Sequence, residues 1–198
     1  MDTLELTTRC RTIALWAGPL AAASVALVIA AEITSSGMLN PLGTAGAIAG
    51  LLAGIALVVG TIGLHLRHRH TDTASGDVPF LIMIAGAVLA AGGMWDQVFT
   101  IPVLAANAPQ LLQQAHPSVL AGFLLSYGIL GTGALAWTIS MRRQQHLAKS
   151  SARWLIAGSI FCFTPLPTRF FLLAIAISIV AARDTNPTTS PNPIAVNA

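Results

Sequence analysis

The chain has 198 residues, of which 55% are hydrophobic and only 9% are charged, and its formal net charge is +3. Soluble domains carry about 25% charged residues, so this composition excludes a water-facing globule and indicates one integral membrane domain, residues 1–183. The pI near 9.5 does not indicate a nucleic-acid partner, because the basic residues lie in short segments beside apolar stretches, where they set membrane orientation.

The first apolar stretch, 12–31, has roughly the 20 residues that a bilayer core requires. A secretory signal peptide is the alternative, since Arg9 and Arg11 precede the stretch and small residues follow in "VIAAE". The apolar run is longer than the roughly 7–15 residues of a signal peptide. We therefore expect an uncleaved span, kinked at Pro19.

The second apolar stretch, 44–66, contains glycines at four-residue spacing. Gly46, Gly50 and Gly54 therefore share one helix face. Small residues on one face let another helix approach closely in a membrane, so we expect a close helix contact there. The pattern favours packing within the chain and leaves a homo-oligomer open.

Three histidines follow in "HLRHRH", residues 65–70. Metal ligands on one helix face need a spacing of three or four, and only His65 and His68 have it. No cysteine or acid completes a ligand set, although Asp72 is near. We therefore expect a basic surface loop with no metal and no other cofactor.

Two further long stretches, 79–101 and 118–141, are predicted to span, and Asp77 suits the N-cap position of the first of them. The last apolar region would be roughly 43 Å long as a single helix, which exceeds a core of about 30 Å. Two short helices, 152–164 and 168–183, joined by the Pro-rich turn "TPLPT", fit the sequence better.

The distribution of cations supports six spans. With a cytoplasmic N-terminus, only Arg169 of the ten lysines and arginines falls outside. The cations on the inner side are Arg9, Arg11, Arg67, Arg69, Arg142, Arg143, Lys149, Arg153 and Arg183. Five spans would move Arg183 to the outside, against the positive-inside rule.

We thus expect an all-α, polytopic transmembrane helical bundle of about six spans in the cytoplasmic (inner) membrane of the cell. Both termini would be cytoplasmic, the lipid bilayer would be the partner, and the tail 184–198 would be disordered. Trp16, Trp137 and Trp154 fall near predicted inner ends and Trp95 near an outer end, as in an aromatic belt.

The only acid within the third stretch, Asp96, lies roughly 24 Å along the helix from Phe80, near the outer edge of the core. Trp95 beside it favours an interfacial depth. Two interpretations stay open. Asp96 is either a boundary or helix-packing residue, or a functional carboxylate.

Other polar residues are expected near the same depth, namely Glu32, Gln97, His116 and Tyr127. Tyr127 lies roughly 13 Å below the outer edge, so its hydroxyl needs a partner such as Asp96. We call these five residues the candidate polar cluster, which by depth alone would line a small outward-facing cavity.

No phosphate-binding glycine loop, H-E-x-x-H or G-x-S-x-G motif occurs in the sequence, so we do not expect an enzyme. Two function classes remain. One is a structural or interaction protein that packs through the glycine face. The other is a small-molecule or proton-coupled transporter, or a ligand-binding membrane protein, that uses the candidate polar cluster.

The segments "WDQVFTIPVLAANAPQLL", "LAGFLLSYGILGTGALAWTISMRR" and "ARWLIAGSIFCFTPLP" resemble a group of uncharacterised small six-span bacterial membrane proteins. The matching positions are Trp95, Pro102, Pro109, Trp154 and Pro165. The resemblance covers roughly the last two-thirds of the chain and implies six spans, but it transfers no catalytic residue. The short last two spans and the histidine loop depart from the group.

Overall fold

The computed structural model describes residues 3–34, 40–68, 77–112, 117–144, 147–164 and 170–183. Within these residues the chain is helical and contains no strand, which confirms the prediction of an all-α bundle. The predicted tail 184–198 lies outside the described residues. The long helices are α1 (Thr3–Ile33), α2 (Pro41–His68), α3 (Asp77–Trp95) and α5 (Pro117–Arg143).

Helix α3 continues without a break through a π-helical segment into a further short helix. The segments are η3 (Asp96–Thr100), α4 (Ile101–Asn107) and the 3-10 turn η4 (Pro109–Leu111). The last two helices are α6 (Lys149–Phe161) and α7 (Phe171–Arg183), each of 13 residues. At 1.5 Å per residue each is about 20 Å long, shorter than a bilayer core of about 30 Å.

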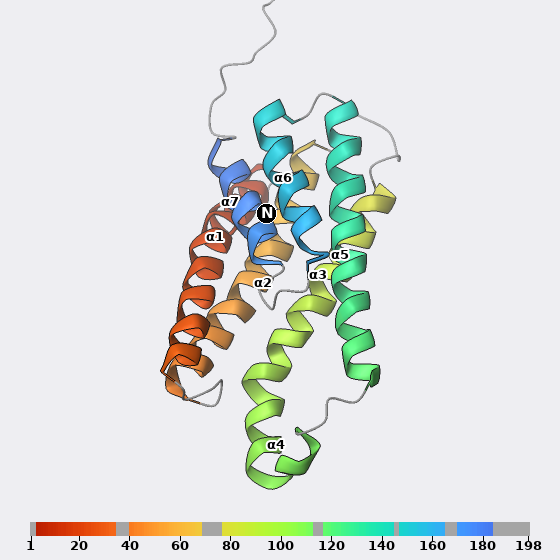
Figure 1. Cartoon of the computed structure of the whole chain (residues 1–198). Helices are drawn as coiled ribbons and strands as arrows, with labels where there is room; N and C mark the ends of the chain where they lie inside the picture. Colours follow the sequence, from red (N-terminus) through yellow and green to blue (C-terminus); the bar gives the residue numbers. More distant parts are fainter. Residues whose placement is uncertain are drawn as a thin grey trace, which may run out of the picture.

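Among the described residues, four helices are long and apolar enough to cross a membrane. They are Glu5–Ile33, Pro41–Arg67, Asp77–Asn107 and Pro117–Arg143. In Figure 1, α1 and α2 lie side by side, and α3 crosses behind α5. The short helices α6 and α7 fill only one half of the bundle, between these two pairs.

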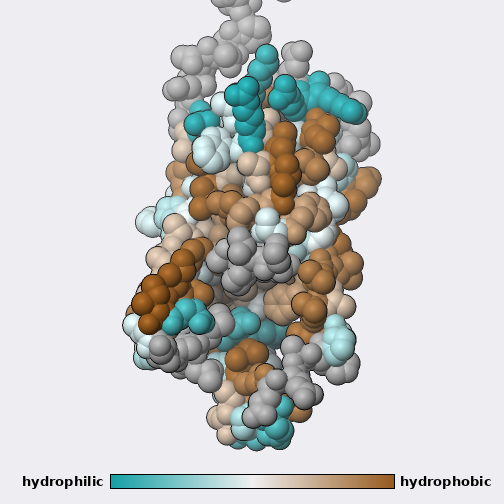
Figure 2. Space-filling view, in the orientation of Figure 1, coloured by the Kyte–Doolittle hydropathy of each residue, from teal (hydrophilic) through white to brown (hydrophobic). Residues whose placement is uncertain are grey.

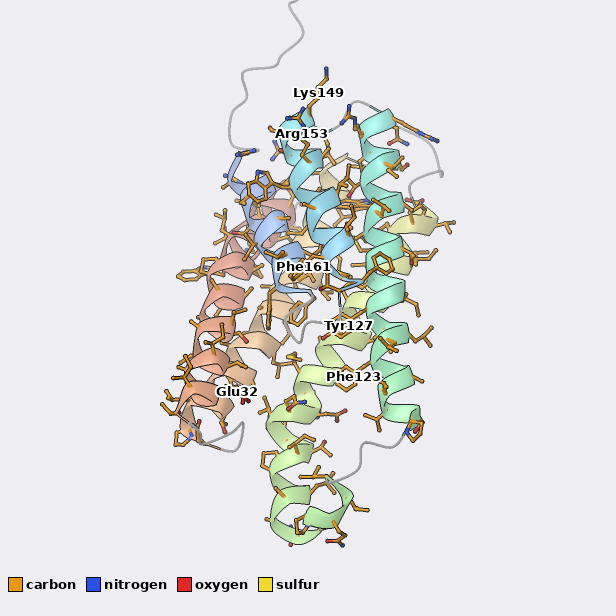
Figure 3. All side chains as sticks on the ribbon, viewed as in Figure 1. Glu32, Phe123, Tyr127, Lys149, Arg153 and Phe161 are labelled. Atoms are coloured by element: carbon orange, nitrogen blue, oxygen red, sulfur yellow. The ribbon has the colours of Figure 1, made fainter. Side chains whose placement is uncertain are left out.

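The half-length packing of α6 and α7 follows from their contacts. A Cβ on Gly50, about 14 Å from the start of α2, would lie 3.4 Å from the ring of Phe171, the first residue of α7. In the last turn of α7, the Ala181 carbonyl accepts a 3.0 Å hydrogen bond from Arg11 Nε of α1. The last residue of α6, Phe161, lies level with the middle of α5 (Figure 3). The two helices therefore form a hairpin in which Phe161, at the end of α6, and Phe171, at the start of α7, both lie at about half the depth of the bundle (Figure 3).

All described lysines and arginines lie toward one end of the bundle, which we call the basic end (Figure 3). There α1 and α3 begin, α2 and α5 end, and the α6–α7 hairpin starts and finishes. Lys149 and Arg153 mark this end in Figure 3, and Figure 2 shows hydrophilic side chains gathered there above apolar flanks. The opposite end carries Glu32 at the end of α1 and, among the described residues, no cation.

The predicted glycine face of α2 lies against helices of the same chain. A Cβ on Gly46 would lie 3.0 Å from a Val28 methyl of α1, and one on Gly54 would lie 3.2 Å from the Ala91 side chain of α3. A Cβ on Gly50 would lie 2.9 Å from the Ser24 hydroxyl, which donates a 2.7 Å hydrogen bond to the Gly46 carbonyl. Three neighbouring helices, α1, α3 and α7, therefore occupy this face.

The tightest helix crossing joins α3 and α5. A Cβ on Gly86 would lie 2.3 Å from the backbone nitrogen of Leu130, and one on Gly133 would lie 2.4 Å from that of Met83. Real Cβ atoms do not approach backbone so closely, so only glycine permits this crossing.

Pro19 lies inside α1, where its missing N–H leaves the Leu15 carbonyl without its helical donor. The Ser178 hydroxyl of α7 donates a 2.9 Å hydrogen bond to that carbonyl. The proline expected to kink the helix thus creates an acceptor that fixes α7 against α1, as happens when helices pack around a proline in a membrane.

Helix α1 contains the predicted apolar stretch 12–31 and extends back to Thr3. An ion pair between Arg9 and Glu5 at helical i,i+4 spacing supports this polar extension. One sequence expectation differs from the structure. Trp137 is only 1% exposed and its Nε1 has no hydrogen-bond partner within the described structure. It is therefore a core residue and not part of an aromatic belt, whereas Trp16, Trp95 and Trp154 are exposed.

We expect Gly86→Ala to lower the unfolding midpoint of the purified protein in detergent. The added methyl group would collide with the α5 backbone, and overpacking of this kind costs about 1–3 kcal/mol. Gly128→Ala is the matched control on α5, because nothing lies within 4 Å of its Cβ position and alanine favours a helix. Equal midpoints for the two variants would contradict the observed crossing.

Candidate functional site

Asp96 begins the π-helical segment η3, in the interior of the long helical rod from Asp77 to Asn107. The sequence suggested that this helix ends at residue 101, with Asp96 near its boundary. In the structure the helical rod continues past both residues to Asn107. Pro102 explains the local widening. It cannot donate to the Val98 carbonyl, and the turn rearranges so that the Ile101 N–H donates to the Asp96 carbonyl, five residues back.

The candidate polar cluster is not assembled in the described structure. The Asp96 carboxylate is exposed and accepts a 3.0 Å hydrogen bond from the Thr100 hydroxyl. Gln97 is half-buried beside it. Tyr127 is 4% exposed on α5, with its ring 6.4 Å from that of Phe123.

The helices that carry the cluster are also separated. No pair of described Cα atoms closer than 8 Å joins η3 to α1 or to α5. Glu32 is exposed at the end of α1 (Figure 3), and the Cα atoms of Glu32 and Tyr127 each lie more than 8 Å from that of Asp96. His116 lies outside the described residues.

A more organised set of polar side chains lies at the basic end, where α2 approaches the start of α3. His65, one turn from the end of α2, is 7% exposed. Its Nε2 lies 3.1 Å from Asp77 Oδ1, and its ring stacks on Phe80 with centroids 3.8 Å apart and an interplanar angle of 7°. The imidazole is thus fixed by a carboxylate at its edge and an aromatic ring on its face.

Local helix geometry places these groups. Asp77 and Phe80 are three residues apart at the start of α3, so both point from one helix face. Pro79 lies in this first turn, where its missing N–H costs nothing. Asp77 begins the helix, where its negative charge also interacts favourably with the helix dipole.

An open cavity of about 360 Å³ lies beside the His65–Asp77 pair. Its walls are Ile62 and Leu66 of α2 with Leu81 and Ile84 of α3, in addition to His65, Asp77 and Phe80. The cavity is therefore largely apolar with one polar corner, and its volume falls within the range of small-molecule pockets.

Sequence reasoning placed His65 in a basic loop and so missed this site. Helix α2 continues to His68, which carries His65 into the helix and against α3. Two features of the sequence could have indicated this site. Asp77 and Phe80 are three residues apart at the start of α3, and His65 lies one turn from the end of α2.

The chemistry that this arrangement offers is hydrogen bonding and stacking. In the described parts of the chain, no three His, Cys, Asp or Glu side chains lie close enough to hold a metal ion. Cys10 and Cys162 are buried inside the bundle and are not joined in a disulfide, and the Cys162 thiol donates a 3.4 Å hydrogen bond to the Gly158 carbonyl of α6.

No protein-family model, no curated protein and no solved structure matches this chain. The resemblance to small six-span bacterial membrane proteins therefore stays a prediction.

We expect His65 and Asp77 to be energetically coupled. His65→Ala removes both the hydrogen bond and the stacking on Phe80, so it should destabilise the protein more than Asp77→Ala. Contacting polar residues give interaction energies of about 0.5–3 kcal/mol, and the half-exposed Asp77 favours the lower part of that range. A double-mutant cycle on the unfolding free energy in detergent measures the coupling, and strict additivity of the two single variants would refute it.

Proposed function

We propose that this chain is an integral protein of the cytoplasmic membrane that binds a small amphipathic molecule between α2 and α3 at its basic end. Four long helices cross the bilayer, and the α6–α7 hairpin enters from the basic side and returns to it. The basic end faces the cytoplasm.

Two observations support the membrane placement. Four helices have the length and composition of spans, and their apolar outer residues include Leu81, Val88 and Leu125, which are 54–63% exposed. The cations of the described residues lie at one end, as the positive-inside rule requires of a cytoplasmic face. A half-depth hairpin keeps residue 183 on the same side as residue 149, so the proposal preserves the charge bias that favoured six spans.

Single cysteines in a variant lacking Cys10 and Cys162 test this topology. We expect Asn107→Cys to react with a membrane-impermeant maleimide in intact cells, and Lys149→Cys to react only after the membrane is permeabilised. Thr164→Cys, at the turn after α6, distinguishes a hairpin from two complete spans. The hairpin predicts no labelling of Thr164→Cys from outside, and six complete spans predict efficient labelling.

The observation that carries the binding proposal is the buried His65, held between Asp77 and Phe80 at the polar corner of an apolar cavity. An apolar body fits the aliphatic walls, and a head group that donates hydrogen bonds fits the Asp77 carboxylate. A few placed polar groups on an otherwise apolar wall are typical of ligand sites.

Alkyl probes that differ only in head group test this specificity in lipid nanodiscs. We expect dodecylamine and dodecanol to raise the unfolding midpoint more than dodecanoate, because bound ligand stabilises the folded state and Asp77 repels a carboxylate. Ile84→Trp, which fills the cavity, should abolish the difference, whereas Leu124→Trp on the exposed face of α5 should retain it. Equal responses in both variants would contradict binding in this cavity.

Transport through the region of Asp96 is a second candidate, favoured by one observation. Asp96 opens a π-helical segment, and such segments occur frequently at functional sites. If Asp96→Asn, rather than Ile84→Trp, removes the response to the alkyl probes, this candidate replaces the first. A structural or interaction protein that packs with a partner through the glycine face of α2 is supported less, because the chain's own helices occupy that face.

A further inference from the structure

The start of α6, at the basic end, combines two cations with an uncapped helix N-terminus. Figure 3 shows Lys149 and Arg153 there, and both residues are exposed. The first N–H groups of a helix have no carbonyl partner within it. Ala148, which precedes α6, provides no side-chain acceptor for them. Ala152 is the first residue of α6 whose N–H donates to a carbonyl of the described chain, that of Ala148 at 3.0 Å.

The charges at this helix start are the opposite of those that stabilise one. The N-terminus is the positive end of the helix dipole, so acids, and not cations, stabilise the first turn. The first turn of α6 contains no acid and begins with Lys149. Arg142 and Arg143 in the last turn of α5 and Arg183 in the last turn of α7 have the favourable placement for cations. The start of α6 therefore carries excess positive charge that a bound anion would offset.

The neighbouring helices supply no negative charge to this point. Helix α6 contacts α5 and α7, and none of these three helices contains an aspartate or a glutamate. The ion pairs between described residues lie in α1 and between α2 and α3. Neither Lys149 nor Arg153 has a side-chain hydrogen bond or an ion pair in the described structure.

A buried serine in the same turn also lacks a partner. Ser151 is 5% exposed, and its hydroxyl makes no hydrogen bond within the described parts of the chain. The other buried serines and threonines of the described structure all donate to backbone carbonyls, namely Ser24, Thr61, Thr138 and Ser159. Among described residues, only Trp137 Nε1 is both unbonded and sealed from solvent. The Ser151 oxygen therefore retains some access from outside.

Helix geometry directs these groups toward one point. Cα–Cβ bonds tilt toward the helix N-terminus, so Ser151, the third residue of α6, presents its hydroxyl beside the free N–H groups. The longer Arg153 side chain returns toward the same level. Backbone N–H groups at a helix start bind phosphate, a guanidinium adds paired N–H donors, and a serine hydroxyl adds another. These donors exceed what the two oxygens of a carboxylate accept, so a phosphate group fits them better.

The exposed face of α6 continues from this point as an apolar surface. Ala157 and Ile160 follow Arg153 at spacings of four and three residues, so they share its helix face. Ile160 is 56% exposed, and Trp154, beside Arg153, is 47% exposed. A phospholipid with its phosphate at the helix start would place an acyl chain along this face. Basic sites between helices on the cytoplasmic side bind anionic head groups.

We propose that the start of α6 binds a phosphate group, recognised by the helix N-terminus, Ser151 and Arg153, with Lys149 adding charge. The site lies on a different helix from the ligand cavity beside His65 and does not rest on that cavity. An anionic phospholipid of the cytoplasmic leaflet and a soluble phosphate both present the required group. Only the lipid source rests on the proposed membrane placement.

The test uses the full chain in phosphatidylcholine nanodiscs, with and without phosphatidylglycerol. The choline cation would lie among the cations of the site, so phosphatidylglycerol is the preferred lipid. Native mass spectrometry measures retained phosphatidylglycerol, and the unfolding midpoint provides a second readout. The variants are Arg153→Gln, which removes the guanidinium, and Ser151→Ala, which removes the hydroxyl.

Each variant has a matched control. Arg9→Gln also removes one positive charge at the basic end, but α1 does not contact α6 in the described structure. Ser159→Ala also removes a buried hydroxyl from α6, roughly 12 Å further along the helix.

We expect wild type, Arg9→Gln and Ser159→Ala to retain phosphatidylglycerol. Arg153→Gln should retain it about tenfold less, which corresponds to the loss of one charge-assisted contact, and Ser151→Ala about fivefold less, as for one neutral hydrogen bond. Because the Ser151 hydroxyl has no partner in the described chain, Ser151→Ala should not lower the midpoint in phosphatidylcholine alone. Inorganic phosphate added to phosphatidylcholine nanodiscs separates the sources. If phosphate alone raises the midpoint of wild type but not of Arg153→Gln, the site takes a soluble phosphate.

Three results would overturn the proposal. Equal responses of Arg153→Gln and Arg9→Gln to both ligands would indicate diffuse attraction by the whole basic end. Equal responses of Ser151→Ala and Ser159→Ala would show that the buried hydroxyl does not contact the ligand. The third is the lack of any response to phosphatidylglycerol or to phosphate in wild type. The phosphate arm works in any orientation and no variant alters the cavity beside His65, so failure of this site is distinguishable from failure of the proposed function.

Discussion

Close approach of helix backbones at glycine is the constraint on which the rest of the structure depends. In a bilayer, burying apolar side chains gives no gain over contact with lipid, so helices associate through dense packing and hydrogen bonds. The α3–α5 crossing has backbone where Cβ atoms at Gly86 and Gly133 would lie. The α1–α2 pair has the same character at Gly60 and Gly63, and α2, which these contacts hold in place, forms one wall of the cavity beside His65.

Hydrogen bonds from hydroxyl groups add to the helix contacts made at glycine. Ser24 bonds to the Gly46 carbonyl, and Ser178 bonds to the carbonyl released by Pro19. Buried Thr61, Thr138 and others bond to carbonyls four residues back in their own helices. A polar group without a partner is costly in hydrocarbon, so these hydrogen bonds let the hydroxyls be buried within the helix packing.

The helical architecture could be predicted from the sequence because span length and charge asymmetry depend only on local composition. The glycine face of α2 could also be predicted, because a four-residue spacing places the three glycines on one side of the helix. The identity of the neighbour could not be predicted this way, since nothing in Gly50 itself distinguishes Ser24 of α1 from another chain.

The site was harder to anticipate for a physical reason. Depth along a helix can be counted from sequence, but the rotation of one helix against another cannot. Asp96, Tyr127 and Glu32 have suitable depths, yet their helices do not bring them together. His65 was assigned to a loop because its sequence neighbours are basic, although it is 7% exposed and stacked on Phe80.

The half-depth hairpin of α6 and α7 gives the protein an uneven cross-section. Of the described helices, six share the area near the basic end, and the four long ones remain at the level of Glu32 (Figure 1). In the proposed orientation the protein displaces more lipid from the cytoplasmic leaflet than from the opposite one. A wedge of this shape fits best where the membrane curves so that the cytoplasmic leaflet is the expanded one.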